Sequence, residues 1–583
     1  MTDDGLETEA MAESHSTSGA AAGRNPRAFL RRPSSVVCRL LFVLCLLSSG
    51  TAYAKDDLTI GITQFPSTFH PNIDAMVAKS YILAMTERPF TAYDASWRLV
   101  CMLCTELPTF ENGLAVRERT PEGKDGVALT YKIQPGAAWG DGAPVTSTDV
   151  LFTWKVGREP KSGVEGLELY RRILKIDIVD DKTFVLHVDR VTFDYNAIND
   201  LRVLPAHLEE AAFAEPSQYR TRTRFDTDTT NPGLYFGPYR ITQVSPGAYV
   251  ALEPNPTWYG KKPFFTRIVV KVIENTAALE ANLLSGGVDY IAGELGLTLD
   301  QALAFEAKHR DQYRYLYKPG LTYEHIDLNL DNAILADLRV RKALAYALDR
   351  VTINERLFGG RQPPANSFLS PLDWPYAKDL PGYPYDPKQA AALLEEAGWK
   401  TAAGSVRRNA QGAALTLELM STAGNRIREL VEQVLQSQWK ALGIDVRIRN
   451  EPARVFFGDT VKKRKFAAMA MYAWVSAPEN VPRSTLDSKE IPSEANGWSG
   501  QNATGYKSAE MDRLIDAIEV ELDRDKRAAL WHRIQEKYLE DLPVIPLFYR
   551  ADPFIIPTWL EDIVPTGHED PSTLWVETWR SSR

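Results

Sequence analysis

The chain has 583 residues, of which 44% are hydrophobic and 25% charged, and its formal net charge is −9. This composition is typical of a globular protein and excludes a disordered, collagenous or disulfide-rich chain; at about 150 residues per domain it predicts three or four folding units. The negative charge and the lack of a long Lys/Arg run indicate no nucleic-acid partner.

The N-terminus has the pattern of a cleavable export signal. Arginines precede an apolar run from Leu40 to Leu47, and Ala52-Tyr53-Ala54 follows as a small-x-small site. The apolar run is too short to span a bilayer of about 30 Å as a helix. We therefore predict that residues 1–54 are a leader removed after Ala54. Lipidation at Cys45 is a weaker alternative, because a leucine precedes it where a lipobox has a small residue.

Two cysteines remain beyond the leader, Cys101 and Cys104, in a C-x-x-C spacing. In an exported protein this spacing favours a local disulfide, whereas in a cytosolic protein it would favour redox chemistry. Two sulfurs without a nearby Cys/His pair make a poor zinc site. We predict a disulfide and no metal site.

The first half of the chain is rich in strand patterns. Thr146 and Asp149 form a capping box that begins a helix running through Trp154. Elsewhere, β-branched and apolar runs between turns predict strands, and one segment that ends before Gly286-Gly287 predicts a helix. The predicted strands cover residues 58–62, 129–133, 176–179, 184–188, 239–244, 249–253, 268–273 and 288–291, and the helix covers 276–284.

The second half has more helix signals. Asp337 can cap a helix whose apolar stripe runs from Val340 to Val351, and Arg339 and Arg341 on its flank are expected to form salt bridges. Strands mixed with helices in both halves predict an α/β fold. Further helices are predicted at 387–397, 425–442, 511–518 and 525–539, and strands at 444–448, 467–474 and 543–549.

Four motifs occur in one order over nearly the whole chain beyond the leader. They are the strand 129–133 with W-G-D-G-A-P-V-T at 139–146 and D-V at 149–150; G-P-Y at 237–239 with L-E-P-N-P at 252–256 and W-Y at 258–259; D-L-R-V-R-K-A-L at 337–344 with D-R at 349–350; and Y-D-P at 385–387 with L-L at 393–394 and E-A-G-W at 396–399. Together they resemble the family 5 extracellular solute-binding proteins, which serve peptide, oligopeptide and nickel ABC importers. Pro254 stands where that family usually has Arg.

The resemblance implies a two-lobed periplasmic binding protein fold of type II, with an extra subdomain on the first lobe. Two strands would cross between the lobes, near residues 318–330 and 541–550. The implied domains are lobe one at 55–322 plus 543–583, with the inserted subdomain at 93–225, and lobe two at 323–542.

The resemblance also implies a function. A monomer in the periplasm would capture a peptide-like solute by lobe closure, without a cofactor, and deliver it to an inner-membrane ABC permease. A metal chelate, an opine or an oligosaccharide is an alternative ligand on the same fold. A secreted hydrolase is less favoured, because the sequence has no H-E-x-x-H, P-loop or G-x-S-x-G motif, and we predict no catalytic residue.

Candidate ligand-binding residues lie where strands end, since such loops face the crevice of open α/β sheets. Gln64 and Phe65 follow the first predicted strand, and Trp474 ends the run 467–474. In peptide-binding members an acid near this Trp pairs with the ligand's amino terminus. The expected Asp is absent, and Glu479 is the nearest acid.

A second candidate segment is the Gly- and Asn-rich loop that carries Asn496 and Trp498 and leads to Tyr506. Glycines and amides suit a loop that bends around a polar ligand. The stretch 420–425 lacks the Arg and Tyr of dipeptide-binding members. We therefore do not expect a dipeptide held in their manner.

Overall fold

A computed structural model describes residues 55–401 and 405–583. The predicted leader, its cleavage site after Ala54 and Cys45 lie outside the described residues. Within those two ranges, none of the helices combines the length and the apolar character that crossing a membrane requires.

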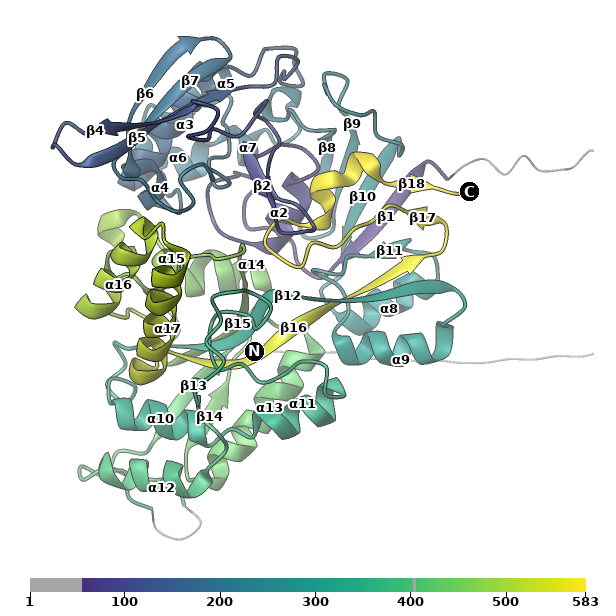
Figure 1. The fold of residues 1–583 in the computed structure, drawn as a ribbon. Coiled ribbons are helices and arrows are strands. Elements are labelled where there is room, and N and C mark those ends of the chain that lie inside the picture. The colour runs from purple at the N-terminus through teal and green to yellow at the C-terminus, as the bar shows by residue number, and fades with distance from the viewer. Residues whose placement is uncertain (1–54, 402–404) are drawn as a thin grey trace, which may run out of the picture. The chain divides into compact units, whose positions relative to one another are not determined.

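A mixed ten-stranded sheet runs through the molecule in the order β14-β13-β15-β12-β16-β11-β1-β10-β9-β8 (Figure 1). Its two long strands, β12 (Tyr313–Leu328) and β16 (Val544–Pro557), pair antiparallel over almost their whole length. The other strands are β1 (Asp57–Ile62), β8 (Tyr239–Ser245), β9 (Tyr249–Pro254), β10 (Arg267–Val272), β11 (Tyr290–Ile291), β13 (Thr416–Met420), β14 (Asp445–Ile448) and β15 (Met469–Val475).

Buried apolar side chains form two large cores that meet at β16. The first core includes Leu58 to Leu295 and then Phe554 to Trp579, and the second includes Leu299 to Phe548. We call the parts around them the first and second lobes. β16 therefore passes from one core to the other, whereas of these two cores β12 contributes buried residues only to the second. The expected lobe boundary at 322/323 falls inside β12, and that at 542/543 falls just before β16 begins.

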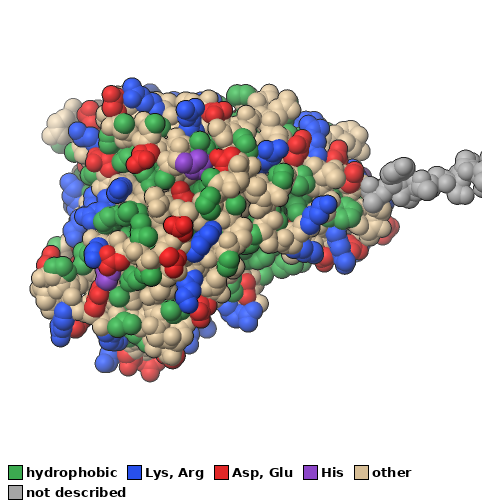
Figure 2. Space-filling view, turned by 90° about the horizontal axis from the view of Figure 1, so that it is seen from above, with side chains coloured by type: hydrophobic (Ala, Val, Ile, Leu, Met, Phe, Trp, Pro, Cys, Tyr) green, Lys and Arg blue, Asp and Glu red, His purple; other side chains and the backbone are tan. Residues whose placement is uncertain are grey.

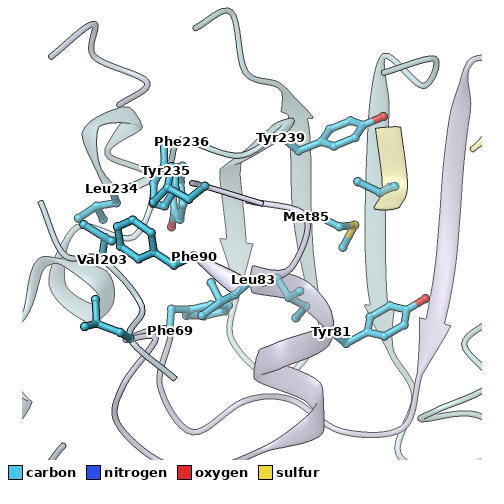
Figure 3. Packing of buried hydrophobic residues seen from close by; sticks show 14 of the residues in the cluster. Phe69, Tyr81, Leu83, Met85, Phe90, Val203, Leu234, Tyr235, Phe236 and Tyr239 are labelled. Carbon is cyan, nitrogen blue, oxygen red and sulfur yellow. The ribbon is translucent and has the colours of Figure 1, made fainter. Parts of the chain in front are cut away.

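Part of the first core is shown in Figure 3, where Tyr81 and Leu83 extend from α2 (Val77–Leu83) among side chains of the surrounding loops. Both are almost fully buried. The sequence did not predict this helix. Its N-cap residue is Met76, whose side chain makes no capping hydrogen bond, so the usual start signal is missing.

A separate four-stranded sheet, ordered β4-β5-β7-β6, lies with α3 (Ser147–Arg158) in the range expected for the inserted subdomain. The helix begins at the predicted capping box, where the Thr146 N–H donates to Asp149 Oδ2 at 2.8 Å. Cys101 and Cys104 are joined by a disulfide just before this sheet. The strands are β4 (Ala115–Arg119), β5 (Asp125–Lys132), β6 (Ile173–Asp180) and β7 (Thr183–Val188).

The second lobe carries the two longest helices in the described part of the chain, and two expectations about it were wrong. The stripe from Val340 to Val351 is not one helix, because the Asp349 side chain accepts the Thr352 N–H and begins a second helix, leaving Val351 57% exposed. The helices are α8 (Thr276–Leu284) and α9 (Leu299–His309) near the crossing strands, then α10 (Leu338–Tyr346), α11 (Arg350–Phe358), α12 (Pro387–Glu396), α13 (Arg426–Ala441), α16 (Ala509–Val520) and α17 (Arg524–Asp541).

Arg341 is the other correction, because it forms no salt bridge with any residue that the structure describes. It is buried and donates to the backbone carbonyls of Leu335, Asp541 and Leu542 at 2.7 to 3.1 Å. Arg339 does pair with Asp337, at 2.6 Å. An arginine on the buried side of a helix can thus satisfy backbone carbonyls, two of them at the end of α17, instead of a carboxylate.

Basic and acidic side chains are intermixed on the face shown in Figure 2. This face therefore presents no broad patch of one sign, of the kind that binding to a phosphate backbone requires.

Candidate functional site

Parallel strands of both lobes end beside the paired strands β12 and β16, which run between the lobes. In the first lobe β1 ends at Ile62 and β11 at Ile291, and in the second lobe β13 ends at Met420 and β15 at Val475. Loops at the carboxyl ends of parallel strands line the ligand crevice of open α/β sheets. The candidate site is therefore the junction of these loops with the crossing strands.

A pocket, here called the hinge pocket, lies at this junction. Its wall combines the loops after β11 and β13 with the crossing strands and the end of α11, and much of it is apolar. The polar lining residues are Thr298, Glu324, Gln362, Asn425, Arg428 and Arg550.

Glu324 and Arg428 form a buried ion pair in the wall of the hinge pocket. Arg428 Nε donates to Glu324 Oε1 at 2.5 Å, and its Nη1 donates to Thr422 Oγ1 at 2.9 Å. Arg550 lies 3.9 Å from Glu324 Oε2 and 3.4 Å from Asp552 Oδ1. Burial raises the pKa of Glu324, but the two arginines outweigh burial and hold this pKa below its ordinary value. The pocket lining thus pairs two cations with one carboxylate.

Gln362 adds an amide that lacks a partner. The residue is 5% exposed, and its backbone N–H donates to Asn354 Oδ1, but its side chain makes no hydrogen bond among the described residues. α13 begins at the same pocket with Asn425 as its N-cap, and a helix N-terminus favours negative charge. Two arginines, a free amide and a helix N-terminus are groups that suit a carboxylate.

Gln64 and Phe65 lie directly after β1, as predicted for residues at the crevice. Phe65 is 7% exposed and packs edge-on against Phe69, with ring centroids 5.9 Å apart. Gln64 is half-buried. The glutamine is therefore the more accessible of the two.

Trp474 lies near the end of β15, opposite Tyr323 of β12. Its ring is half-buried and packs against Tyr472 at 5.5 Å. It lines a second pocket together with Tyr323, Asp327 and Gln501. This ring therefore forms a pocket wall.

Glu479 is held by side chains of its own lobe. Arg527 Nε pairs with Glu479 Oε1, and Trp374 Nε1 donates to Glu479 Oε2 at 2.8 Å. The Glu479 N–H donates to Asp373 Oδ2, also at 2.8 Å. Both carboxylate oxygens already accept a donor, so a ligand ammonium would have to share this group with Arg527.

Asn496, Trp498 and Tyr506 have different surroundings in their segment. Asn496 bonds within its own loop, accepting the Ser493 N–H at 2.8 Å. Tyr506 is 4% exposed in the second core, and its hydroxyl donates to Asp541 Oδ2 at 2.5 Å. Trp498 is half-buried at a φ of 63°, and its indole N–H makes no hydrogen bond within the described residues. Trp498 is thus the member of this segment best placed to meet a ligand.

We expect Trp498→Ala to weaken ligand binding roughly thirtyfold, because truncating a binding tryptophan can cost about 2 kcal/mol. Calorimetric titration measures the affinity, and melting of the ligand-free protein is the control. Unchanged affinity would exclude Trp498 as an anchor. A large fall in the melting temperature would show instead that the ring supports the fold.

The sequence interpretation missed the hinge pocket altogether. Glu324 and Arg550 lie on strands that read as apolar, and Arg428 lies on α13. One signal was present in that helix: Arg428 and Glu432 interrupt the buried stripe that continues to Leu435. Charged residues at core positions of a helix are uncommon unless they are paired or functional.

Glu569 is a further residue that the sequence did not indicate. Its N–H donates to the Ser476 carbonyl at 3.2 Å, which places it beside the loop after β15. Burial, then Asp200 and Asp570, raise the pKa of Glu569 well above its ordinary value. A cationic group of a ligand would relieve this accumulation of carboxyl groups.

Comparisons with known proteins agree with this geometry. Residues 109–490 match bacterial extracellular solute-binding proteins, family 5 Middle. Oligopeptide-binding protein AppA of Bacillus subtilis is 27% identical over 81% of this chain and 85% of its own length. The nickel-binding periplasmic protein of Escherichia coli is 22% identical over 88% of this chain and 93% of its own. The crystal structure of the oligopeptide binding protein of Thermus thermophilus, complexed with a pentapeptide, has a TM-score of 0.83 and 26% identity over 90% of this chain and 96% of that one.

Proposed function

The chain belongs to the bacterial extracellular solute-binding proteins of family 5, and on that premise we propose that it captures a peptide-like solute between its two lobes and delivers it to an ABC importer. Two relatives named above are oligopeptide-binding proteins, and one was crystallised with a pentapeptide. They support a peptide as the ligand of this chain too.

The hinge pocket is the observation that carries this proposal. Arg428, Arg550 and the free amide of Gln362 would bind the carboxylate end of the ligand. Hydrogen bonds to charged groups contribute about 1.5–3 kcal/mol each. Closure of the lobes would exclude water and strengthen these contacts.

The remaining contacts follow from where the candidate residues lie. Glu569 would accept the ligand's ammonium group, together with Glu479, which would share its carboxylate between that group and Arg527. Gln64, Phe65, Trp474 and Trp498 would contact the body of the ligand, while Asn496 and Tyr506 would shape the loop that carries Trp498. In this role the chain binds its ligand without converting it.

The export pattern of the first 54 residues supports a mature protein in the periplasm. There it would act as a monomer and present its closed, loaded form to an inner-membrane permease. A ligand shifts a protein toward closure only by its differential affinity for the closed state. The permease would thereby distinguish loaded from empty protein.

Native mass spectrometry of protein purified without refolding would identify any retained ligand directly. Calorimetry should then compare peptides that have a free carboxylate with the same peptides as C-terminal amides. We expect the amides to bind at least about tenfold more weakly, because the charge-assisted bonds in the hinge pocket are lost. Equal affinity would contradict the role of the pocket.

Two further arms test the ligand class and the absence of catalysis. Binding of a nickel–histidine chelate or an opine, but of no peptide, would contradict a peptide-like ligand. Turnover of a fluorogenic peptide would contradict a role in binding alone.

A further inference from the structure

Lys462 of the second lobe inserts into an acidic socket of the first lobe. It directly follows η4 (Phe456–Val461), and its Nζ donates to Asp74 Oδ1 at 2.6 Å. The same nitrogen lies 3.3 Å from Glu165 Oε1 and 3.5 Å from the Gly163 carbonyl. Lys462 is 7% and Asp74 3% exposed, so water is largely excluded from this contact.

The first lobe builds the socket without help from Lys462. Arg220 donates to both oxygens of Asp74, at 2.7 and 2.6 Å, and Ser67 Oγ donates to Oδ2 at 2.8 Å. Burial raises the pKa of Asp74, but Lys462 and Arg220 outweigh burial and hold this pKa well below its ordinary value. Asp74 therefore remains an anion with a partner of its own.

The two lobes fit closely against each other on both sides of the socket. A Cβ on Gly458 would lie 3.0 Å from Ser67 Cβ, and a Cβ on Gly497 would lie 2.5 Å from the Pro160 carbonyl oxygen. Ser499 Oγ also donates to the Val164 carbonyl at 2.5 Å. The segments around Lys462 and Trp498 therefore both close onto the first lobe.

A second charged contact between the lobes differs because its carboxylate also has a partner within the second lobe. Arg190 of the subdomain pairs with Glu519 of α16 at 2.8 Å, and the Phe193 N–H donates to the Glu519 carbonyl at 3.0 Å. Glu519 also pairs with Arg483 of its own lobe. Its carboxylate would stay paired if the lobes separated.

Lys462 has no alternative acidic partner among the described residues of its own lobe. Both of its acidic partners, Asp74 and Glu165, belong to the first lobe, and the described part of the second lobe gives it none. Separation of the lobes would leave Asp74 with Arg220 but deprive Lys462 of every anionic contact. Among the charged contacts between the lobes, this one depends most on closure.

We propose that Lys462 is a positioning residue that couples lobe closure to ligand binding, by docking into the socket of Asp74 and Glu165 only when the lobes close. Docking favours the closed state before any ligand arrives. A protein whose binding-competent state is more populated shows higher apparent affinity. The inference rests on the proposed function for its ligand readout but not for its structural readout.

The test compares Lys462→Met with Lys462→Arg and with Lys463→Met as a matched control. Lys463 is adjacent, but it pairs with Asp459 of its own lobe, at 2.8 Å, and is 35% exposed. Small-angle X-ray scattering of the ligand-free proteins reports lobe closure, and stopped-flow fluorescence reports ligand dissociation.

For Lys462→Met we expect a larger radius of gyration without ligand and about tenfold weaker binding, mostly through faster dissociation. Lys462→Arg should retain most of both properties, and Lys463→Met should match the wild type. An unchanged radius and dissociation rate for Lys462→Met would overturn the proposal. The scattering result stands even if no peptide binds, which separates failure of this inference from failure of the proposed function.

Glu165→Gln provides a second route if Lys462→Met does not fold. This carboxylate is 16% exposed and has a weaker contact with Lys462 than Asp74 has. We expect a larger radius of gyration without ligand and faster ligand dissociation, both by a smaller amount than in Lys462→Met. A variant that closes and releases ligand like the wild type would count against the proposal.

Discussion

Arg428→Met is expected to destabilise the ligand-free protein by about 3 kcal/mol, because it leaves Glu324 without its closest counter-ion. The side chains of this pair are 8% and 4% exposed. Removing one partner of a buried ion pair costs about 3–5 kcal/mol. Arg550, 3.9 Å from Glu324, compensates in part, so we expect the lower end of that range. Urea unfolding followed by circular dichroism measures the change.

A double-mutant cycle separates the pair from the rest of the pocket. Glu324→Gln alone should also destabilise, and the double variant should be about 2 kcal/mol more stable than the sum of the single effects predicts. Arg426→Met is the matched control, since this arginine is exposed two residues away on the same helix. If Arg428→Met were as stable as Arg426→Met, the buried pair would contribute nothing.

Glu432→Gln is expected to stabilise the protein at pH 8 by about 3 kcal/mol and to change it little near pH 4.5. Burial raises the pKa of Glu432 to about 7. Between the unfolded pKa, about 4.3, and pH 7, the folded state keeps a proton that the unfolded state has lost. Stability therefore falls as pH rises through this interval and stays lower above it, by about 1.4 kcal/mol per pKa unit.

The contacts of Glu432 explain why an amide should be accepted there. Its Oε2 accepts Asn450 Nδ2 at 2.7 Å, while its Oε1 has no hydrogen-bond partner among the described residues. Denaturant titrations at pH 4.5, 6 and 8 measure the change in stability, and Glu396→Gln, at an exposed position, is the control. A stability difference between Glu432→Gln and wild type that does not grow with pH would contradict the raised pKa.

Much of the fold could be predicted because its signals are local. The capping box at Thr146 and Asp149 begins a helix where predicted, and the helix predicted from residue 387 begins there with Asp386 as its N-cap. Strand patterns located β1 and the β8–β9 hairpin, and ordered motifs indicated the two-lobed α/β fold, which is confirmed. Where a local signal was missing, as before α2, the element was missed.

The site was harder to predict because its chemistry depends on residues far apart in the chain. Glu324 acquires its charge state from Arg428, 104 residues away. Glu479 accepts a hydrogen bond from Trp374, 105 residues earlier. No spacing rule along the sequence connects such partners. Gln64, Phe65 and Trp474 could be nominated only because loops at strand ends face the crevice, and Trp498 only because its loop is rich in Gly and Asn.

The two cores share β16, and this has a consequence for how the chain must fold. β16 pairs with β11 of the first lobe and with β12, so neither half of the sheet is complete without a strand near the C-terminus. During synthesis or export, the earlier strands emerge with open edges that can pair with other chains. Nascent molecules should therefore depend on holding chaperones until β16 has emerged, and C-terminal truncations that remove this strand should aggregate rather than leave one lobe folded.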